Sequence, residues 1–225
     1  MPLPFKKYKR KFIIGILPLL TSCAAYQTHV SDVPLLSEKG EARVDLAVSL
    51  QPGANATVSY AATEKLALQT FGSIGDNKQF YIQGAAGIFS NSTINRVWEI
   101  YGGVGHGYGV AYRDANSYIP NNFYQLYFTQ FNYGRIADEN SNLELGFGFK
   151  GGFLNMHLDD ISENLSIQPG NNNLLFEPIG FVRFGSSNLR VNLKLGISSI
   201  YNLDKDVSTP LNNYFNIGLG INYKL

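Results

Sequence analysis

Cysteine, charge and long apolar runs are all scarce in this chain of 225 residues. Its single cysteine excludes a disulfide framework and any zinc site built from cysteine pairs. No window of about eighteen uncharged apolar residues occurs, which excludes a membrane-spanning helix. Charged residues make up only 16% of the chain, whereas 15 Phe and 14 Tyr supply enough apolar area for a core. The composition therefore favours one folded, predominantly β domain.

The first 22 residues have the organisation of a secretory signal. Five of the residues at positions 6–11 are basic, and the short apolar run Phe12–Leu20 follows them. The run ends at Leu20-Thr21-Ser22-Cys23, which resembles the lipobox of bacterial lipoproteins. The resemblance implies cleavage before Cys23 and acylation of its thiol and new amino group, so Cys23 is predicted to be a lipid anchor. The alternative is an ordinary signal peptide that happens to precede a cysteine.

Removal of residues 1–22 changes the charge of the protein. All five charges in that segment are basic, so 13 of the 18 basic residues remain against 17 acidic ones, and the net charge changes from +1 to −4. No basic cluster remains to follow a nucleic-acid backbone, which excludes nucleic acid as a partner. No acidic pair follows Cys23. By analogy with lipoprotein sorting signals, this favours an anchor in the outer membrane that faces the periplasm.

Residues 24–39 show no clear period, so residues 23–39 are predicted to form a lipidated tether. From residue 40 onward apolar and polar residues alternate, which is the signal of half-buried strands. The segment 189–197 is the clearest case, because every odd position in it is apolar. Ten strands are predicted, at 41–50, 54–62, 66–75, 80–89, 96–112, 122–135, 142–155, 174–185, 188–200 and 213–225.

The predicted connections alternate in length after the first hairpin. Short turns join strands two to three, four to five, six to seven and eight to nine. Long connections fall at the other end, and the predicted external loops lie around 76–79, 113–121, 156–173 and 201–212. This asymmetry is typical of outer-membrane barrels, whose turns are periplasmic and whose loops are external. An even number of strands also returns the C-terminus to the short-turn end, where the lipidated N-terminus is expected.

Alternation alone does not say which strand face points inward, because ligand-binding barrels are apolar inside and membrane barrels are apolar outside. Glycine favours the second arrangement. In the strand 96–112, Gly103, Gly105, Gly107 and Gly109 share a face with Glu99, and glycines 146, 148 and 152 share a face with Glu144 and Lys150. A crowded lumen needs small residues, whereas glycine only weakens a strand that faces open solvent.

Two strands fit this pattern poorly. Residues 122–133 change parity midway, which either a β-bulge or a wrong strand assignment there would explain. The strand 174–185 places Ile179 and Phe181 on the same inward face as two charged residues.

The inward face carries six basic and four acidic side chains in this register. They are Arg43, Asp45, Glu99, Glu144, Lys150, Glu177, Arg183, Arg190, Lys194 and Lys224. A barrel of about ten strands is narrow, and buried charges in it must be paired. The near balance of sign predicts a network of salt bridges that fills the lumen. The alternative is a selectivity ring for anions, which needs one sign clustered at a constriction.

Other motifs carry less information. Residues 146–151 match G-x-G-x-x-G, but they lie within a predicted strand with no helix after it, so no nucleotide site is predicted. His157, Asp159 and Asp160 fall in the longest predicted loop and leave a surface hydrolase as an alternative, although a solvated loop is the preferred interpretation. No catalytic site, metal site or cofactor is predicted.

With its lipobox, the segment 34–41 entering the first strand and an alternating C-terminal strand, the chain resembles small bacterial outer-membrane β-barrel lipoproteins. The resemblance implies a single antiparallel up-and-down barrel over residues 40–225, insertion by the barrel-assembly machinery, and membrane lipid around the exterior. The expected role is structural or surface interaction without enzymatic activity. The alternatives are a lipid-anchored periplasmic barrel of lipocalin type, which would hold a small apolar ligand, and a narrow pore.

Overall fold

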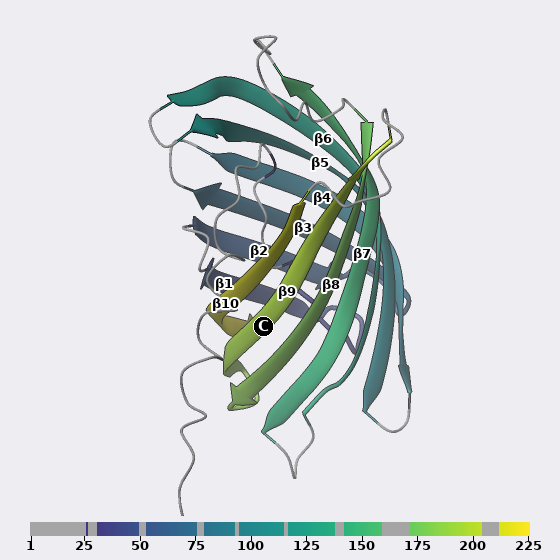
Figure 1. Cartoon of the computed structure of the whole chain (residues 1–225). Coiled ribbons are helices and arrows are strands. Elements are labelled where there is room, and N and C mark those ends of the chain that lie inside the picture. The colour runs from purple at the N-terminus through teal and green to yellow at the C-terminus, as the bar shows by residue number, and fades with distance from the viewer. Residues whose placement is uncertain are drawn as a thin grey trace, which may run out of the picture.

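The computed structural model describes residue 26 and the ranges 31–49, 53–75, 79–92, 95–114, 117–137, 142–158, 172–203 and 212–225. Ten strands in these ranges form one closed antiparallel barrel in which each strand pairs with its neighbours in the chain and β1 pairs with β10 (Figure 1). The strands are β1 (Ala42–Ser49), β2 (Gly53–Ala61), β3 (Leu66–Gly75), β4 (Phe80–Ser92), β5 (Arg96–Asp114), β6 (Ser117–Arg135), β7 (Leu143–Leu158), β8 (Asn172–Gly185), β9 (Leu189–Asn202) and β10 (Asn212–Lys224). Within the described ranges, no helix is long and apolar enough to cross a membrane. The predicted ten-stranded barrel is confirmed.

The hairpin between β5 and β6 differs from the prediction. Residues 113–121 are predicted as an external loop, but β5 continues to Asp114 and β6 begins at Ser117. Pairing of Ala111 with Ile119 and of Tyr112 with Tyr118 carries the two strands beyond the neighbouring ones, with register shifts on either side. Cross-strand pairing of this kind extends a hairpin where the local sequence alone indicates a loop.

Neither explanation offered for the parity change within residues 122–133 is needed, because these residues belong to one strand, β6, without a bulge. The register between β6 and its two neighbours is continuous from Asn122 to Arg135. Leu126 and Phe128 therefore face the interior on the same side as Gln130 and Asn132, and all four are buried. The apparent change of parity arises because the inward face of β6 is apolar in one half and polar in the other.

The exterior of the barrel is apolar and the interior is polar. On β9, the side chains at odd positions from Leu189 to Ile197 are 41–51% exposed, whereas Asn192 and Lys194 are fully buried. Aromatic residues gather at both ends of the outer wall, with Phe80, His106 and Phe123 packed together at the loop-bearing end and Trp98 paired with Tyr133 at the other. An apolar band between two aromatic groups is typical of membrane barrels.

The inward glycines accommodate aromatic side chains in the lumen. A Cβ atom added to Gly105 would lie 2.1 Å from the hydroxyl oxygen of Tyr81, and one added to Gly107 would lie 2.2 Å from Cζ of Tyr124. These distances are far shorter than a van der Waals contact, so only glycine fits at these positions. The choice of the glycine-bearing face as the lumen is confirmed.

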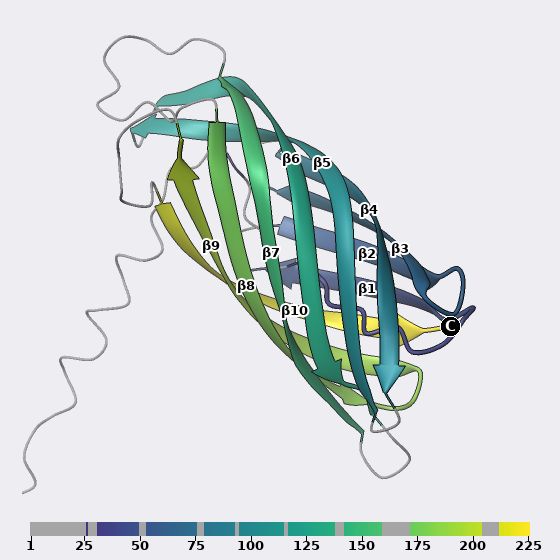
Figure 2. The ribbon, with the colours of Figure 1, turned by 90° about the vertical axis from the view of Figure 1, so that its right-hand side faces the viewer.

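The two ends of the barrel are distinct, and they are called here the turn end and the loop end. The turn end carries the β2–β3, β4–β5, β6–β7 and β8–β9 connections, the start of β1 and the C-terminus, where Leu225 N donates to Ala42 O over 2.9 Å (Figure 2). The loop end carries the other five connections. Positions inside the lumen are described below relative to these two ends.

Candidate functional site

The N-terminal segment lies inside the barrel rather than outside it. Residues 31–36, which the sequence pattern assigns to the tether, are all buried, as is Tyr26. Residues 31–36 occupy the lumen from about its middle to the turn end, where Gly40 N donates to Ala61 O just before the chain enters β1 (Figure 2). Residues 31–36 have no strand period because they lie in the lumen and do not pair in the sheet. Their lack of a period is the reason that the sequence pattern predicts a tether there. Residues 31–36 are called the plug segment below.

At the turn end, two glutamates hold the plug segment and the residues after it. The backbone N–H of Leu36 donates to Glu99 Oε1 over 2.7 Å, and Asn132 Nδ2 donates to the other oxygen of the same carboxylate over 2.8 Å. Ser37 donates to Glu41 Oε2 from both its backbone N–H and its hydroxyl, over 2.8 and 2.6 Å. These bonds fix the bend by which the chain leaves the lumen and becomes β1.

In the turn-end half of the lumen, Arg183 of β8 binds three consecutive residues of the plug segment. Its guanidinium donates to Asp32 Oδ1 over 2.8 Å, to Val33 O over 2.5 Å and to Pro34 O over 3.5 Å. Lys194 forms a second ion pair with Asp32, at 2.9 Å. Gln130 of β6, two strands away from β8 around the barrel, donates to the carbonyl of Asp32 over 3.0 Å. The segment is therefore held by its backbone as well as by its carboxylate.

The apolar side chains of the plug segment fit gaps in the wall. Val33 and Leu35 pack with Val97, Ile179 and Phe181 in one buried cluster. Cβ atoms added to two wall glycines would collide with them, at 2.9 Å from Cγ2 of Val33 for position 148 and 2.7 Å from Cδ1 of Leu35 for position 134. The inward Ile179 and Phe181, which fit the sequence pattern poorly, face the plug segment.

Toward the loop end, a lysine and a glutamate of the wall bind the N-terminal residues. Lys150 donates to the hydroxyl of Ser31 and to Gln83 Oε1. The hydroxyl of Tyr26 donates to Glu177 Oε1 over 3.1 Å, and its ring packs edge-on against Tyr124 with 5.2 Å between centroids. Tyr124 in turn stacks on Tyr81 at 5.7 Å. Packed aromatic rings therefore line this half of the lumen.

The predicted lumen charges are brought together as ion pairs, with one residue at the edge of the set. Glu144 forms ion pairs with Arg43, Arg183 and Arg190, and Asp45 pairs with Lys194. Glu177 lies 4.0 Å from Lys150, and Glu99 binds the backbone of Leu36 instead of a cation. Nine of the ten predicted residues are at most 5% exposed. Lys224 lies at the rim of the turn end, where it pairs with Glu38 and Glu41.

Asp32 and Glu41 also belong to this network, although neither is among the ten predicted residues: Asp32 falls in the predicted tether, and Glu41 shares the strand face of Arg43 and Asp45. Both are buried and ion-paired, and both come from the N-terminal side of β1. Their two carboxylates raise the acidic count from four to six and so balance the six basic residues. Two signals in the sequence point to an occupant of the lumen: the surplus of two basic groups and the apolar pair Ile179 and Phe181 on an inward face.

The acidity of Glu41 reflects its position at the turn-end rim, just before β1. Burial by itself raises the pKa of this carboxyl group, but the nearby Arg43 guanidinium and the hydrogen bonds from Ser37 outweigh burial. The net result is a pKa below the ordinary value of 4.5. Glu41 is therefore ionised at neutral pH, as its ion pair with Arg43 at 2.6 Å requires.

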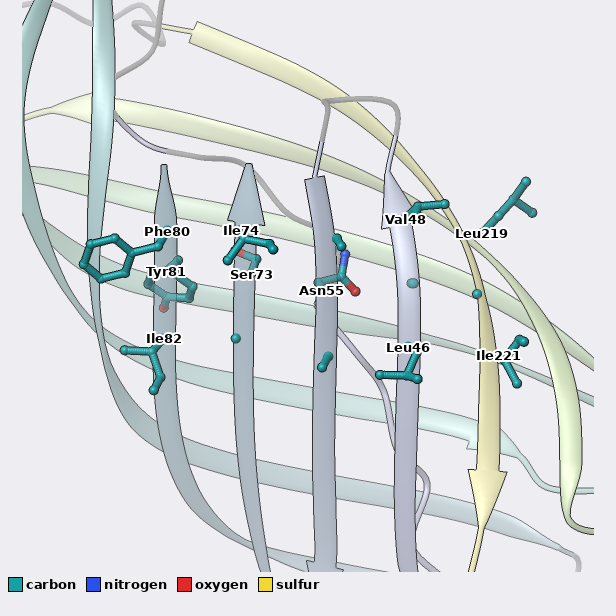
Figure 3. A pocket seen from close by; sticks show the side chains of 15 residues that line it. Leu46, Val48, Asn55, Ser73, Ile74, Phe80, Tyr81, Ile82, Leu219 and Ile221 are labelled. Carbon is teal, nitrogen blue, oxygen red and sulfur yellow. The ribbon is translucent and has the colours of Figure 1, made fainter. Parts of the chain in front are cut away.

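An apolar hollow of about 800 Å³ lies on β1 to β4 and β10 (Figure 3). Small outward residues, Ala54, Ala56 and Gly72, form its floor, and larger ones such as Phe80 and Leu219 surround it. The hollow has no cluster of charged side chains. It suits the flexible acyl chains of a surrounding lipid phase.

The remaining sequence candidates lie elsewhere. Cys23, the signal segment 1–22, Asp159 and Asp160 are outside the described residues, as is most of the predicted loops 156–173 and 201–212. His157 belongs to the end of β7 and its side chain is exposed. The G-x-G-x-x-G sequence at 146–151 lies within β7. Across the part of the chain that the structure describes, no three His, Cys, Asp or Glu side chains gather as metal ligands would.

Comparison with known proteins adds fold similarity only. No family model and no curated protein matches the sequence. A de novo designed transmembrane β-barrel is similar at 11% identity, over 84% of this chain and 98% of the designed one, with a TM-score of 0.33. The N-terminal β-barrel domain of Pseudomonas aeruginosa OprF is similar at 8% identity, over 83% of this chain and 98% of that domain, also with a TM-score of 0.33.

Fold and lumen together define the class of protein. It is a closed ten-stranded antiparallel barrel with an apolar outer wall and a charged interior that its own N-terminal segment fills. This polarity is opposite to that of a ligand-binding barrel, whose interior is apolar. The lipocalin-type alternative therefore does not fit the structure.

Proposed function

We propose that this protein is a lipid-anchored outer-membrane β-barrel with a permanently closed lumen and a structural or surface-interaction role. The observation that carries the proposal is the plug segment, which is bound through side chains and backbone to β5, β6, β8 and β9 inside a barrel whose exterior is apolar. A barrel of this kind buries its outer face in lipid and leaves its external loops as the surface that meets other molecules.

The lipobox and the barrel supply two independent attachments to the membrane. Acylation of Cys23 would anchor the N-terminus, and the apolar exterior would hold the barrel even without the acyl chains. Insertion of such a barrel requires the cell's barrel-assembly machinery. The acyl chains and the lipids around the exterior are then its membrane partners.

Closure of the lumen argues against the pore alternative. An anion-selective constriction needs a ring of like charges around an open path. Here cations and carboxylates alternate in ion pairs, and the carboxylate of Asp32 lies between two of the cations, Arg183 and Lys194. Transport would require these buried pairs to break, which is costly in a low-dielectric interior.

The first test separates membrane insertion from lipid anchoring. Residues 1–23 are replaced by a secretory signal that is not acylated, and isolated membranes are washed at high pH. The protein is expected to stay in the membrane fraction, because its outer wall contacts lipid directly. Release as a folded soluble protein would contradict the transmembrane barrel.

The second test asks whether the barrel conducts ions and whether it has hydrolytic activity. Purified protein in planar lipid bilayers is expected to be electrically silent, and stable unitary currents would favour the narrow pore instead. The role is proposed to be non-enzymatic. A hydrolytic activity that is lost on His157→Ala would overturn that part of the proposal.

A further inference from the structure

The contacts of the N-terminal segment run in order from one end of the lumen to the other. Tyr26 belongs to a buried cluster with Tyr81, the second residue of β4, and with Ile200, near the last residue of β9. Both of those wall residues lie at the loop end of their strands. Leu36 packs with Ala61 and Ala67, which lie at the turn end of β2 and β3.

Intermediate residues follow the same order. Ser31 meets Lys150 halfway along β7, Val33 meets Gly148, and Leu35 meets Gly134, next to the last residue of β6 at the turn end. Each step toward the C-terminus of the segment is thus a step toward the turn end. The chain is oriented through the barrel from the loop end to the turn end.

The position of Tyr26 constrains where Cys23 can lie. Cys23 lies three positions before Tyr26 in the chain, and a fully extended chain of three residues spans about 10–11 Å. The apolar band of a membrane barrel is about 25 Å tall. From a site in the loop half of the lumen, a link this short reaches the loop-end opening but cannot return past the buried plug segment to the turn end.

We propose that the protein is threaded through its own barrel, so that Cys23 emerges at the loop end and its acyl chains enter the outer leaflet of the outer membrane. This inference rests on the proposed function, which supplies the lipid anchor and the orientation of the barrel. It reverses the expectation that the anchor faces the periplasm. The C-terminus remains at the turn end, on the periplasmic side, and so lies across the membrane from the acylated residue.

Contacts with the barrel wall hold the plug segment in one position along the lumen. The ion pairs of Asp32 and the backbone bonds to Arg183 resist sliding of the segment, since sliding by one residue would break all of them. Leu35 and Val33 fill the gaps that Gly134 and Gly148 leave in the wall, where an added Cβ atom would lie within 3 Å of them. The N-terminus is therefore held at one register.

The test locates the N-terminus in the full-length, lipidated protein of intact Gram-negative cells. An epitope is inserted between Ala24 and Ala25, and reference epitopes are placed in residues 204–211 and after Leu225 in separate chains. Incorporation of radiolabelled palmitate confirms that each chain is acylated. Antibody binding is compared before and after permeabilisation of the outer membrane.

Threading predicts that the N-terminal and loop epitopes are labelled equally well before and after permeabilisation, whereas the C-terminal epitope gains signal several-fold after it. An N-terminal epitope that is labelled only after permeabilisation, while the loop epitope is labelled on intact cells, overturns threading and leaves the barrel proposal standing. A loop epitope that is itself silent on intact cells contradicts the proposed function instead.

A cross-link controls for displacement of the segment by the inserted epitope. Val33→Cys and Gly148→Cys are added to the N-terminally tagged chain, and disulfide formation is followed by gel mobility. If the disulfide forms and the N-terminal epitope is still silent on intact cells, the segment is in place and threading toward the loop end is wrong. If the disulfide does not form in the untagged chain, the lumen position of the segment is wrong.

Discussion

Arg183 and Asp32 form a buried ion pair that joins two parts of the chain 151 positions apart, with 2.8 Å between Nη2 and Oδ1. Neither side chain is more than 1% exposed. The pair links the plug segment to β8 near the turn end of that strand. A buried charge that loses its partner is strongly destabilising, so this contact gives the clearest prediction about stability.

Asp32→Asn is expected to lower the free energy of unfolding by about 3 kcal/mol, at the lower end of the range for broken buried pairs, because Glu144 and Asp45 still face the two cations. Urea denaturation of the barrel in lipid vesicles measures the change. The matched control is Glu38→Gln at the turn-end rim, where the side chain is 70% exposed and pairs with Lys224. That exposed pair should contribute less than about 1 kcal/mol. Equal effects of the two substitutions would contradict a buried network.

Gly148→Leu is expected to prevent assembly. A Cβ atom at this position would already lie 2.8 Å from Asn132 Oδ1 and 2.9 Å from Cγ2 of Val33, and leucine adds three further carbon atoms. Heat-modifiable migration on gels and the yield in the membrane fraction report assembly. Gly180→Leu is the control, because a Cβ at that strand glycine meets nothing within 4 Å. Normal assembly of the first variant would mean that this face does not line a crowded lumen.

Cysteines introduced together at Val33 and Gly148 are expected to form a disulfide in a chain whose residues 1–23 are replaced by an unacylated signal. The valine side chain lies against the site of the added Cβ, within the range that disulfide geometry allows. A pair at Val33 and Gly180 should stay reduced, because Gly180 is not among the wall positions that meet the plug segment. Mobility shifts with and without reductant distinguish the two. Cross-linking of both pairs would show that the segment lacks a fixed place.

Acid is expected to weaken the rim contact of Glu41. Because its pKa in the folded protein lies below the ordinary value of 4.5, the ionised form contributes stability above that value and loses the contribution as the pH falls through the folded pKa. Glu41→Gln removes the ion pair with Arg43 and should lower the urea midpoint at neutral pH. The difference between this variant and the unaltered protein should shrink in acid. A difference that is independent of pH would assign the effect to packing alone.

The outer wall could be predicted from the sequence because its pattern is local. Alternation at 189–197 and the glycines beside Glu99 and Glu144 identify the strands and their inward face, and the structure places them as predicted. A period of two follows from the geometry of the strand itself, so it needs no knowledge of distant residues.

The occupant of the lumen could not be predicted in the same way. Residues 31–36 pair with no strand and therefore carry no periodic signal. Asp32 looked like a tether residue because its partner, Arg183, comes into reach only when the barrel closes, whereas the partner of Glu41, Arg43, lies only two positions along the chain. The apparent bulge at Leu126 and Phe128 had the same origin, since those side chains pack in the aromatic half of the lumen.

The amino-acid sequence by itself determined the number of strands, their inward face and the charged character of the interior, because each depends on neighbours along one strand. Only the tertiary structure decided what fills the lumen and in which direction the N-terminus crosses it. Those features depend on ion pairs and packing between residues far apart in the chain, such as Asp32 with Arg183 and Tyr26 with Tyr124. Closure of the sheet brings them together, and no pattern within a single segment encodes that closure.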